Sequence, residues 1–315
     1  MVLTIILLIV GLIMLVIGGD FLVRGASEIA LKLSISPLVI GLTIVAFGTS
    51  APELIIATTS TLKGSSDLAL GNVVGSNICN LALILGVAAL IYPISVHKNS
   101  LRFDWPVTMG SSLLLYIIVR AGIINHYEGL FFVVFLISYL GFITYHSKKD
   151  KTITEEVGEA VADSAKKDTY FKNIAFIVLG GCGLFFGGEL FVNSAQEFAR
   201  FLGVSERVIG LTVVAIGTSL PELVASTIAA FKKQTDIAVG NLMGSNIFNI
   251  LGILGITSII KDVNVNDIIV HTDMLWMLGV TLVVLPMMIS GRKLARTEGL
   301  ILVLIYIFYT YNLVW

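Results

Sequence analysis

Two glutamates stand inside long apolar stretches, where a carboxylate is costly. Glu53 ends the motif GTSAPE and Glu222 ends the motif GTSLPE, and each directly follows a proline. A charged side chain at the centre of a membrane-spanning helix costs about 2.5–3.5 kcal/mol on insertion scales. A buried structural pair or a protonated filler could explain the two glutamates, but this cost favours a site that uses their charge.

Hydroxyl groups and a helix break accompany each glutamate. Thr49 lies four residues before Glu53 and shares its helix face, and Ser50 follows Thr49. Pro52 has no N–H, so the carbonyl of Gly48 loses its helical partner and the turn opens. Unpaired carbonyls at membrane depth are tolerated only where they line a cavity or contact protein. The second motif repeats these residue types at Thr218, Ser219 and Pro221.

A second repeated motif, GSNICN and GSNIFN, supplies further polar groups. Ser76 and Asn80 share a helix face by their spacing, as do Ser245 and Asn249. Each hydroxyl could instead bond to the carbonyl four residues before it, and each amide could join two helices, so these are weaker candidates than the glutamates. The remaining asparagines of these segments are interpreted as structural: Asn72, Asn77, Asn241 and Asn246.

All these candidate groups are hard oxygen donors, namely carboxylates, amides, hydroxyls and carbonyls. No histidine or cysteine stands at a suitable spacing among them, so the set suits Ca²⁺ or Na⁺ rather than zinc or copper. Two glutamates carry a charge of −2, which neutralises one Ca²⁺. With neutral oxygens as further ligands, the same site could hold two or three Na⁺, and a site that takes either load in turn is the basis of exchange.

The composition is that of an integral membrane protein. The 315 residues are 56% hydrophobic and 13% charged, against about 25% charged residues in a soluble domain. Cys79 and Cys182 lie in apolar stretches and predict neither a disulfide nor a metal site. We expect no cofactor, no nucleic acid and no protein partner, only the transported ions and the lipid bilayer, and a monomer is plausible because the predicted fold is complete in one chain.

About ten apolar segments are long enough to span a bilayer as helices. They cover residues 2–23, 36–62, 68–93, 104–121, 128–146, 173–195, 206–231, 237–260, 271–290 and 297–314. A polar segment with charges of both signs, residues 147–172, separates the first five from the last five and is expected to be a linker.

The strongest signal is an internal repeat at an offset of 169 residues. Twelve of fifteen residues are identical between Val39–Glu53 and Val208–Glu222, and the same offset superposes the two asparagine motifs without a gap. The chain therefore consists of two five-helix repeats, 1–146 and 173–315. An odd number of spans per repeat forces the repeats to enter the membrane from opposite sides, and such inverted repeats are typical of secondary transporters with sites near the midplane.

Basic residues set the expected orientation. With the N-terminus outside, fifteen lysines and arginines face the cytoplasm and five face outward, six of the fifteen lying in the linker. We therefore predict both termini outside, a cytoplasmic 147–172 linker, and the plasma membrane as the location. Asp20 and Arg24 are four residues apart and are expected to pair, whereas the second repeat has Glu189 and Asn193 instead.

The doubled motifs resemble the two alpha-repeats of the sodium/calcium exchanger family, within the cation/calcium antiporter superfamily. The resemblance covers most of the chain and implies an all-α membrane fold of ten helices in two inverted five-helix halves. Helices two, three, seven and eight would form the core, and long first and sixth helices would slide across it. The linker is too short for the calcium-binding regulatory region of animal exchangers, so a microbial type without that control is expected.

The resemblance also implies roles for particular residues. Glu53 and Glu222 would hold both Ca²⁺ and Na⁺, with three Na⁺ exchanged per Ca²⁺ and net charge moved. The remaining ligands it implies are the side chains of Thr49, Ser50, Thr218, Ser219, Ser76 and Ser245, the backbone oxygens of Ala46 and Ala215, and a central pair at Asn80 and Asn249. Some microbial relatives have Asp where this chain has Asn249, so one ionisable group fewer is expected here.

Other functions remain open at this point. The same glutamates could bind protons, which makes an H⁺-coupled Ca²⁺ antiporter the alternative, although H⁺ exchangers of the superfamily typically show a Gly-Asn…Glu motif. A K⁺-dependent variant is less favoured. A cation channel more often surrounds an oligomer axis. An intramembrane hydrolase lacks a nucleophile–base set and a zinc signature, so we expect no enzyme activity.

Overall fold

The computed structural model describes residues 1–33, 35–149, 170–203 and 215–314. Most of the predicted linker and the start of the predicted 206–231 span lie outside these residues. Within them, helices lie in each of the ten predicted apolar segments, and four two-residue strands make up the extended structure. The predicted all-helical membrane fold is therefore confirmed.

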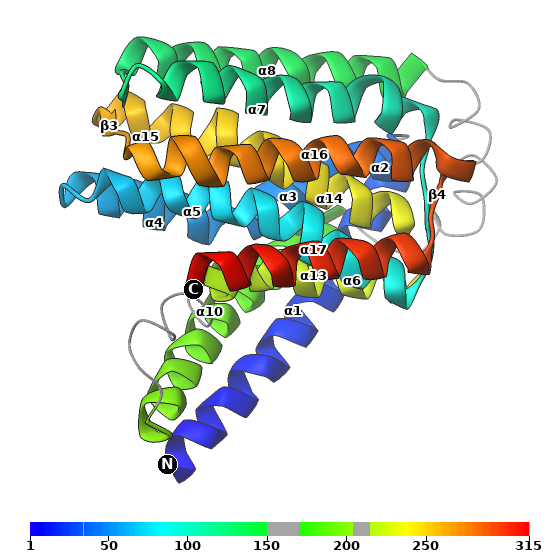
Figure 1. Cartoon of the computed structure of the whole chain (residues 1–315). Coiled ribbons are helices and arrows are strands. Elements are labelled where there is room, and N and C mark those ends of the chain that lie inside the picture. The colour runs from blue at the N-terminus through cyan, green and yellow to red at the C-terminus, as the bar shows by residue number, and fades with distance from the viewer. Residues whose placement is uncertain (34, 150–169, 204–214, 315) are drawn as a thin grey trace.

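The first repeat begins with one long helix and continues with broken ones (Figure 1). Its elements are α1 (Val2–Leu33), α2 (Pro37–Ile40), the π-helical η1 (Gly41–Val45), α3 (Ala46–Thr49), α4 (Ala51–Leu62), α5 (Ser66–Ile78), η2 (Cys79–Ile84), α6 (Leu85–Ile91), β1 (Ile94–Ser95), η3 (Ser100–Asp104), α7 (Trp105–Val119), β2 (Ile123–Ile124) and α8 (His126–Lys149).

The second repeat follows the same order. Its described elements are α10 (Tyr170–Phe201), α12 (Ala215–Thr218), α13 (Leu220–Phe231), α14 (Thr235–Ile247), η5 (Phe248–Leu254), α15 (Gly255–Ile260), β3 (Val263–Asn264), η6 (Ile269–Asp273), α16 (Met274–Ile289), η7 (Ser290–Arg292), β4 (Lys293–Leu294) and α17 (Arg296–Val314).

The span that carries Glu53 is broken where the sequence predicts it. The run from α2 to α3 and helix α4 meet at Ser50, with a bend of 47°. Pro52 stands in the first turn of α4, where a backbone N–H has no helical partner in any case. The preceding helix cannot continue past Pro52, because the proline lacks the N–H for the next helical hydrogen bond. The bend leaves Glu53 in the first turn of a new helix.

Two of the four spans that the resemblance assigned to the core are the most buried of the candidate membrane spans in the described residues. Most of the span α5–α6 (72%) and of α14–α15 (83%) is buried inside the protein, against 28% for α1. The outer helices turn large apolar side chains outward, as a lipid-facing surface requires. Polar groups on these two spans are therefore largely shielded from the surroundings by neighbouring helices.

Helices α1 and α10 pack tightly against each other and lean away from the rest (Figure 1). They run antiparallel, because Gly11 lies against Phe191 whereas Gly25 lies against Asn173 and Ile177. Since these helices are equivalent in the two repeats, their opposite directions show the inverted topology. Each is longer than its predicted span. In α1, buried apolar residues such as Ala26, Ile29 and Ala30 continue past the predicted end at residue 23.

Two short antiparallel strand pairs tie the halves together. Strand β1 pairs with β4 through Ile94 and Leu294, and β2 pairs with β3 through Ile124 and Val263. Each pair joins one strand of the first repeat to one of the second, so the loops at both ends of the core are cross-linked between repeats.

Candidate ion-binding site

The two glutamates lie at the centre, each in the first turn of a helix that follows a break. Glu53 on α4 and Glu222 on α13 are both fully buried, and they are close enough to interact electrostatically. The Ser50 hydroxyl donates to Oε1 of Glu222 at 2.9 Å, which connects the first motif to the carboxylate of the second. Among the described residues, neither oxygen of Glu53 and not Oε2 of Glu222 has a hydrogen-bond partner.

The threonine of the first motif is enclosed by polar groups of the opposite repeat. Thr49 Oγ1 donates to Asn241 Oδ1 at 3.1 Å, lies 3.4 Å from Ser245 Oγ, and approaches the Ala46 carbonyl at 3.2 Å. The Asn241 amide donates in turn to Ser226 at 2.9 Å. The first motif and α14 therefore form one connected hydrogen-bond network beside Glu222.

Several predicted ligands are buried without a hydrogen-bond partner in the described residues. The hydroxyls of Ser76 and Ser219 are in this state, as is Oδ1 of both Asn80 and Asn249. A buried polar atom without a partner costs about 1–3 kcal/mol. Orphaned oxygens gathered in one protein core fit a site whose missing partner is a cation.

The amides of the central pair are held by two further asparagines. Asn80 Nδ2 donates to Asn246 Oδ1, and Asn249 Nδ2 donates to Asn77 Oδ1, both at 3.0 Å. Asn77 and Asn246 also exchange amide–carbonyl bonds at 3.3 Å in each direction. In this cluster the Nδ2 amides of Asn80 and Asn249 are hydrogen-bonded, whereas their Oδ1 atoms remain free to bind a cation.

Sequence reasoning interpreted Asn77 and Asn246 as structural, and their part in orienting the central pair is a finding of the fold. Each lies three residues before the asparagine of the pair in its own half, and each bonds to the asparagine of the other half. Their occurrence at the same offset in both repeats was a signal that could have indicated a shared role.

The two predicted backbone ligands are placed differently. The Ala46 carbonyl accepts the Ser50 N–H at 3.0 Å as well as the Thr49 hydroxyl. Ala215 is the first described residue of α12. In that repeat the Ser219 N–H donates to the Ile216 carbonyl, three residues back rather than four, so the chain is more tightly wound before the second glutamate.

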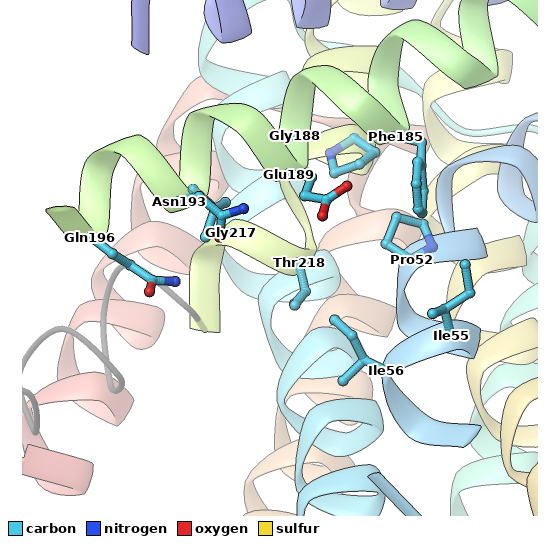
Figure 2. Close-up of a pocket in the computed structure, with 12 residues that line it drawn as sticks. Pro52, Ile55, Ile56, Phe185, Gly188, Glu189, Asn193, Gln196, Gly217 and Thr218 are labelled. Carbon is cyan, nitrogen blue, oxygen red and sulfur yellow. The ribbon is translucent and has the colours of Figure 1, made fainter. Parts of the chain in front are cut away.

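A cavity of about 310 Å³ lies beside the second motif (Figure 2), and another of about 530 Å³ with mostly apolar walls borders the first motif at Phe47 and Gly48. The walls of the smaller cavity are α10, α4 and the second motif, and they include Pro52, Thr218 and, on α10, Glu189. Thr218 therefore faces an opening, whereas its counterpart Thr49 is fully buried. The arrangement places two buried carboxylates and neutral oxygens close to a cavity that reaches Pro52, Thr218 and Pro221.

The carboxylates number only two at this centre. Within the described ranges, no group of three or more histidine, cysteine, aspartate or glutamate side chains could hold a metal ion. Any cation bound here would take most of its ligands from neutral oxygens, which is a donor set for Na⁺ or Ca²⁺.

Comparisons with known proteins agree over the whole chain. The family model described as sodium/calcium exchanger protein matches residues 3–145 and 172–315. Sodium/calcium exchanger MaX1 of Methanosarcina acetivorans is 33% identical over 334 residues, covering 96% of this chain and 95% of that protein. Inner membrane protein YrbG of Escherichia coli is 35% identical over 285 residues, covering 88% and 86%.

Solved structures agree with the sequence comparisons. The sodium-calcium exchanger NCX_Mj, soaked with zero Na⁺ and Ca²⁺, superposes with a TM-score of 0.85 at 29% identity and covers 99% of both chains. The likeness includes both repeats and the core between them.

Proposed function

The chain belongs to the sodium/calcium exchanger family, and on this premise we propose that it exchanges Ca²⁺ for Na⁺ by alternating access at one shared site. The twelve residues predicted from the sequence would supply the ligands, with Glu53 and Glu222 at the centre. The observation that carries the proposal is the set of buried, unpartnered oxygens around two carboxylates.

Exchange requires that Ca²⁺ and Na⁺ bind in turn to the same negatively charged groups. Glu53 and Glu222 balance one Ca²⁺, and they balance most of the charge of three Na⁺ when neutral oxygens fill the coordination shells. With three Na⁺ per Ca²⁺, each cycle moves one net positive charge, and the flux responds to membrane voltage. Because both glutamates come from one chain, a monomer is a sufficient transporting unit.

Alternating access is supported by a difference between two equivalent helix contacts, one of which borders a cavity. This cavity reaches the second motif between α10 and α4, while the equivalent region between α1 and α13 is packed. In the predicted plasma-membrane orientation, with both termini outside, the cavity opens outward and the packed region faces the cytoplasm. The described conformation is then closer to one that faces outward than to one that faces the cytoplasm.

The test is radioactive Ca²⁺ uptake into proteoliposomes. Vesicles loaded with Na⁺ should accumulate Ca²⁺ when external Na⁺ is low. An imposed inside-positive voltage should speed this uptake, because each cycle moves one net positive charge out of the vesicle. Vesicles with an outward H⁺ gradient and no Na⁺ serve as the matched control. Uptake driven only by protons would move the protein to H⁺ coupling, and gradient-independent leak would indicate a channel.

A further inference from the structure

An ion-pair cluster joins α1 to the end of α13. Lys232 Nζ lies 2.6 Å from Asp20 Oδ1 and also approaches the Asp20 carbonyl at 3.5 Å. Arg24 Nε lies 2.8 Å from Asp20 Oδ2, which confirms the predicted pair. The side chains of Asp20 and Lys232 are each 27% exposed, so the bridge is partly shielded from solvent.

The repeat places the same two residue types at equivalent positions of the other half. Offset by 169 residues, Glu189 on α10 corresponds to Asp20, and Lys63 at the end of α4 corresponds to Lys232. Among the described residues, no basic side chain forms an ion pair with Glu189. Its carboxylate instead borders the cavity between α10 and α4 (Figure 2).

The helices are closely packed beside the Asp20–Lys232 ion pair and less closely packed beside Glu189, which forms no ion pair with a described basic residue. A Cβ atom added at Gly19, beside Asp20, would lie 2.7 Å from Ile228 Cδ1 and 3.0 Å from Val224 Cγ1, so α1 and α13 are in direct contact. At the equivalent Gly188, beside Glu189, the nearest such atoms are 3.8 Å away, and Ile55 lines the cavity instead. The α1–α13 contact beside the pair is therefore closely packed, whereas the equivalent α10–α4 contact borders a cavity.

We propose that these four residues form an alternating latch, in which the Asp20–Lys232 bridge closes one access route and a Glu189–Lys63 bridge closes the other after the switch. The proposal rests on the alternating access proposed above. In an inverted repeat, each half can adopt the conformation of its counterpart when the open side changes. The residues that bridge the closed half here then have their equivalents in position to bridge the other.

The physical advantage lies in the exchange of one bridge for another. Breaking a partly shielded ion pair is costly on its own, but forming the second pair offsets this cost. The latch therefore disfavours a state with both routes open without trapping either end state. Arg24 adds a second cation only on the Asp20 side, where the other half has Asn193, so the balance favours the conformation described here.

Two cysteine reporters can read the latch in a Cys182→Ser background. Ile55→Cys reports on the open cavity, and its counterpart Val224→Cys reports on the packed route. Each is labelled with a membrane-impermeant maleimide, the first in right-side-out vesicles and the second in inside-out vesicles. Unreacted Cys79 is buried, and its background labelling is measured in the parent protein.

Removing the charge of one lysine should shift the two reporters in opposite directions. Lys232→Gln should raise the labelling rate of Val224→Cys about fivefold, the factor for roughly 1 kcal/mol, and lower that of Ile55→Cys. Lys63→Gln should lower the labelling of Val224→Cys. Lys232→Arg keeps the charge and should label at the parent rates. Arg24→Asn should change both labelling rates in the same directions as Lys232→Gln, but by a smaller factor.

The outcomes separate the latch from the proposed function. If Lys232→Gln and Arg24→Asn both leave the labelling of Val224→Cys at the parent rate, or if the two lysine variants move it in the same direction, the latch is wrong. Na⁺-driven Ca²⁺ uptake by the parent is measured in the same preparation. Uptake with unchanged labelling rejects the latch alone, whereas parent vesicles without Na⁺-driven uptake reject the exchange function.

Discussion

Thr49 and Thr218 hold the same position in two nearly identical motifs, yet their surroundings differ. Thr49 is fully buried and bonded to Asn241, whereas Thr218 lines a cavity. The same contrast separates Gly19, packed against α13, from Gly188, which has space beside it. Equivalent residues in the two halves therefore have different surroundings, and the difference lies where α1 and α10 pack against the core.

The largest predicted effect tests whether both halves serve one site. Glu53→Gln and Glu222→Gln should each weaken Ca²⁺ binding at least about 100-fold, because each removes half of the charge that balances the ion. Radioactive Ca²⁺ binding to the purified variants measures this. Loss of binding in one variant with normal binding in the other would break the equivalence of the halves.

A second prediction concerns the contact between the two long helices. A Cβ at Gly180 would meet the backbone of α1 at Leu22, whereas a Cβ at the adjacent Gly181 would meet nothing within 4 Å. Gly180→Ala should therefore destabilise the protein by about 1–3 kcal/mol through overpacking, and Gly181→Ala should not. Thermal unfolding in detergent compares them, and equal midpoints would show that the helices do not pack this closely.

A third prediction compares an aspartate–tyrosine pair that occurs in both halves. The Tyr139 hydroxyl donates to Asp104 at 2.9 Å, and the Tyr309 hydroxyl donates to Asp273 at 3.1 Å. Asp104 is only 2% exposed, whereas Asp273 is half-buried. Tyr139→Phe should cost about 1–3 kcal/mol because it leaves a buried carboxyl with one partner fewer.

Tyr309→Phe is the matched control for this pair. Water can replace the lost hydroxyl at the half-buried Asp273, so the unfolding midpoint should fall less than in Tyr139→Phe. A larger fall for Tyr309→Phe would contradict the difference in burial between the halves.

The smallest predicted effect on stability gives the sharpest comparison. Gly188→Ala should change the free energy of unfolding by less than about 0.5 kcal/mol, because its neighbours are at ordinary contact distance. It should nevertheless slow Na⁺-driven uptake. In the opposite conformation Gly188 would pack against α4 as closely as Gly19 packs against α13 here, and a methyl group would obstruct that contact. Gly19→Ala should lower stability as well, and normal uptake by Gly188→Ala would argue against the exchange of conformations.

Much of this architecture could be predicted from the sequence because it follows from local rules. The run of apolar segments, the break before Glu53 and the doubled motifs require only helix length, proline chemistry and an offset of 169 residues. The burial of Glu53 and Glu222 side by side also follows, because the repeats place equivalent residues at one centre.

The remaining features depend on contacts between distant segments. Asn77 and Asn246 orient the central amides only across the interface of the two repeats, which no local pattern reveals. The difference between Thr49 and Thr218 could not be predicted either, since the motifs are alike and the difference comes from how α1 and α10 pack.

Competition at equilibrium tests the central claim of one shared site most directly. Radioactive Ca²⁺ bound to the purified protein should be displaced completely by Na⁺, with a steep Na⁺ dependence because several Na⁺ replace one Ca²⁺, and Glu222→Gln should bind little Ca²⁺ at any Na⁺ concentration. Ca²⁺ that stays bound at saturating Na⁺ would contradict the account, because the two ions would then occupy separate sites.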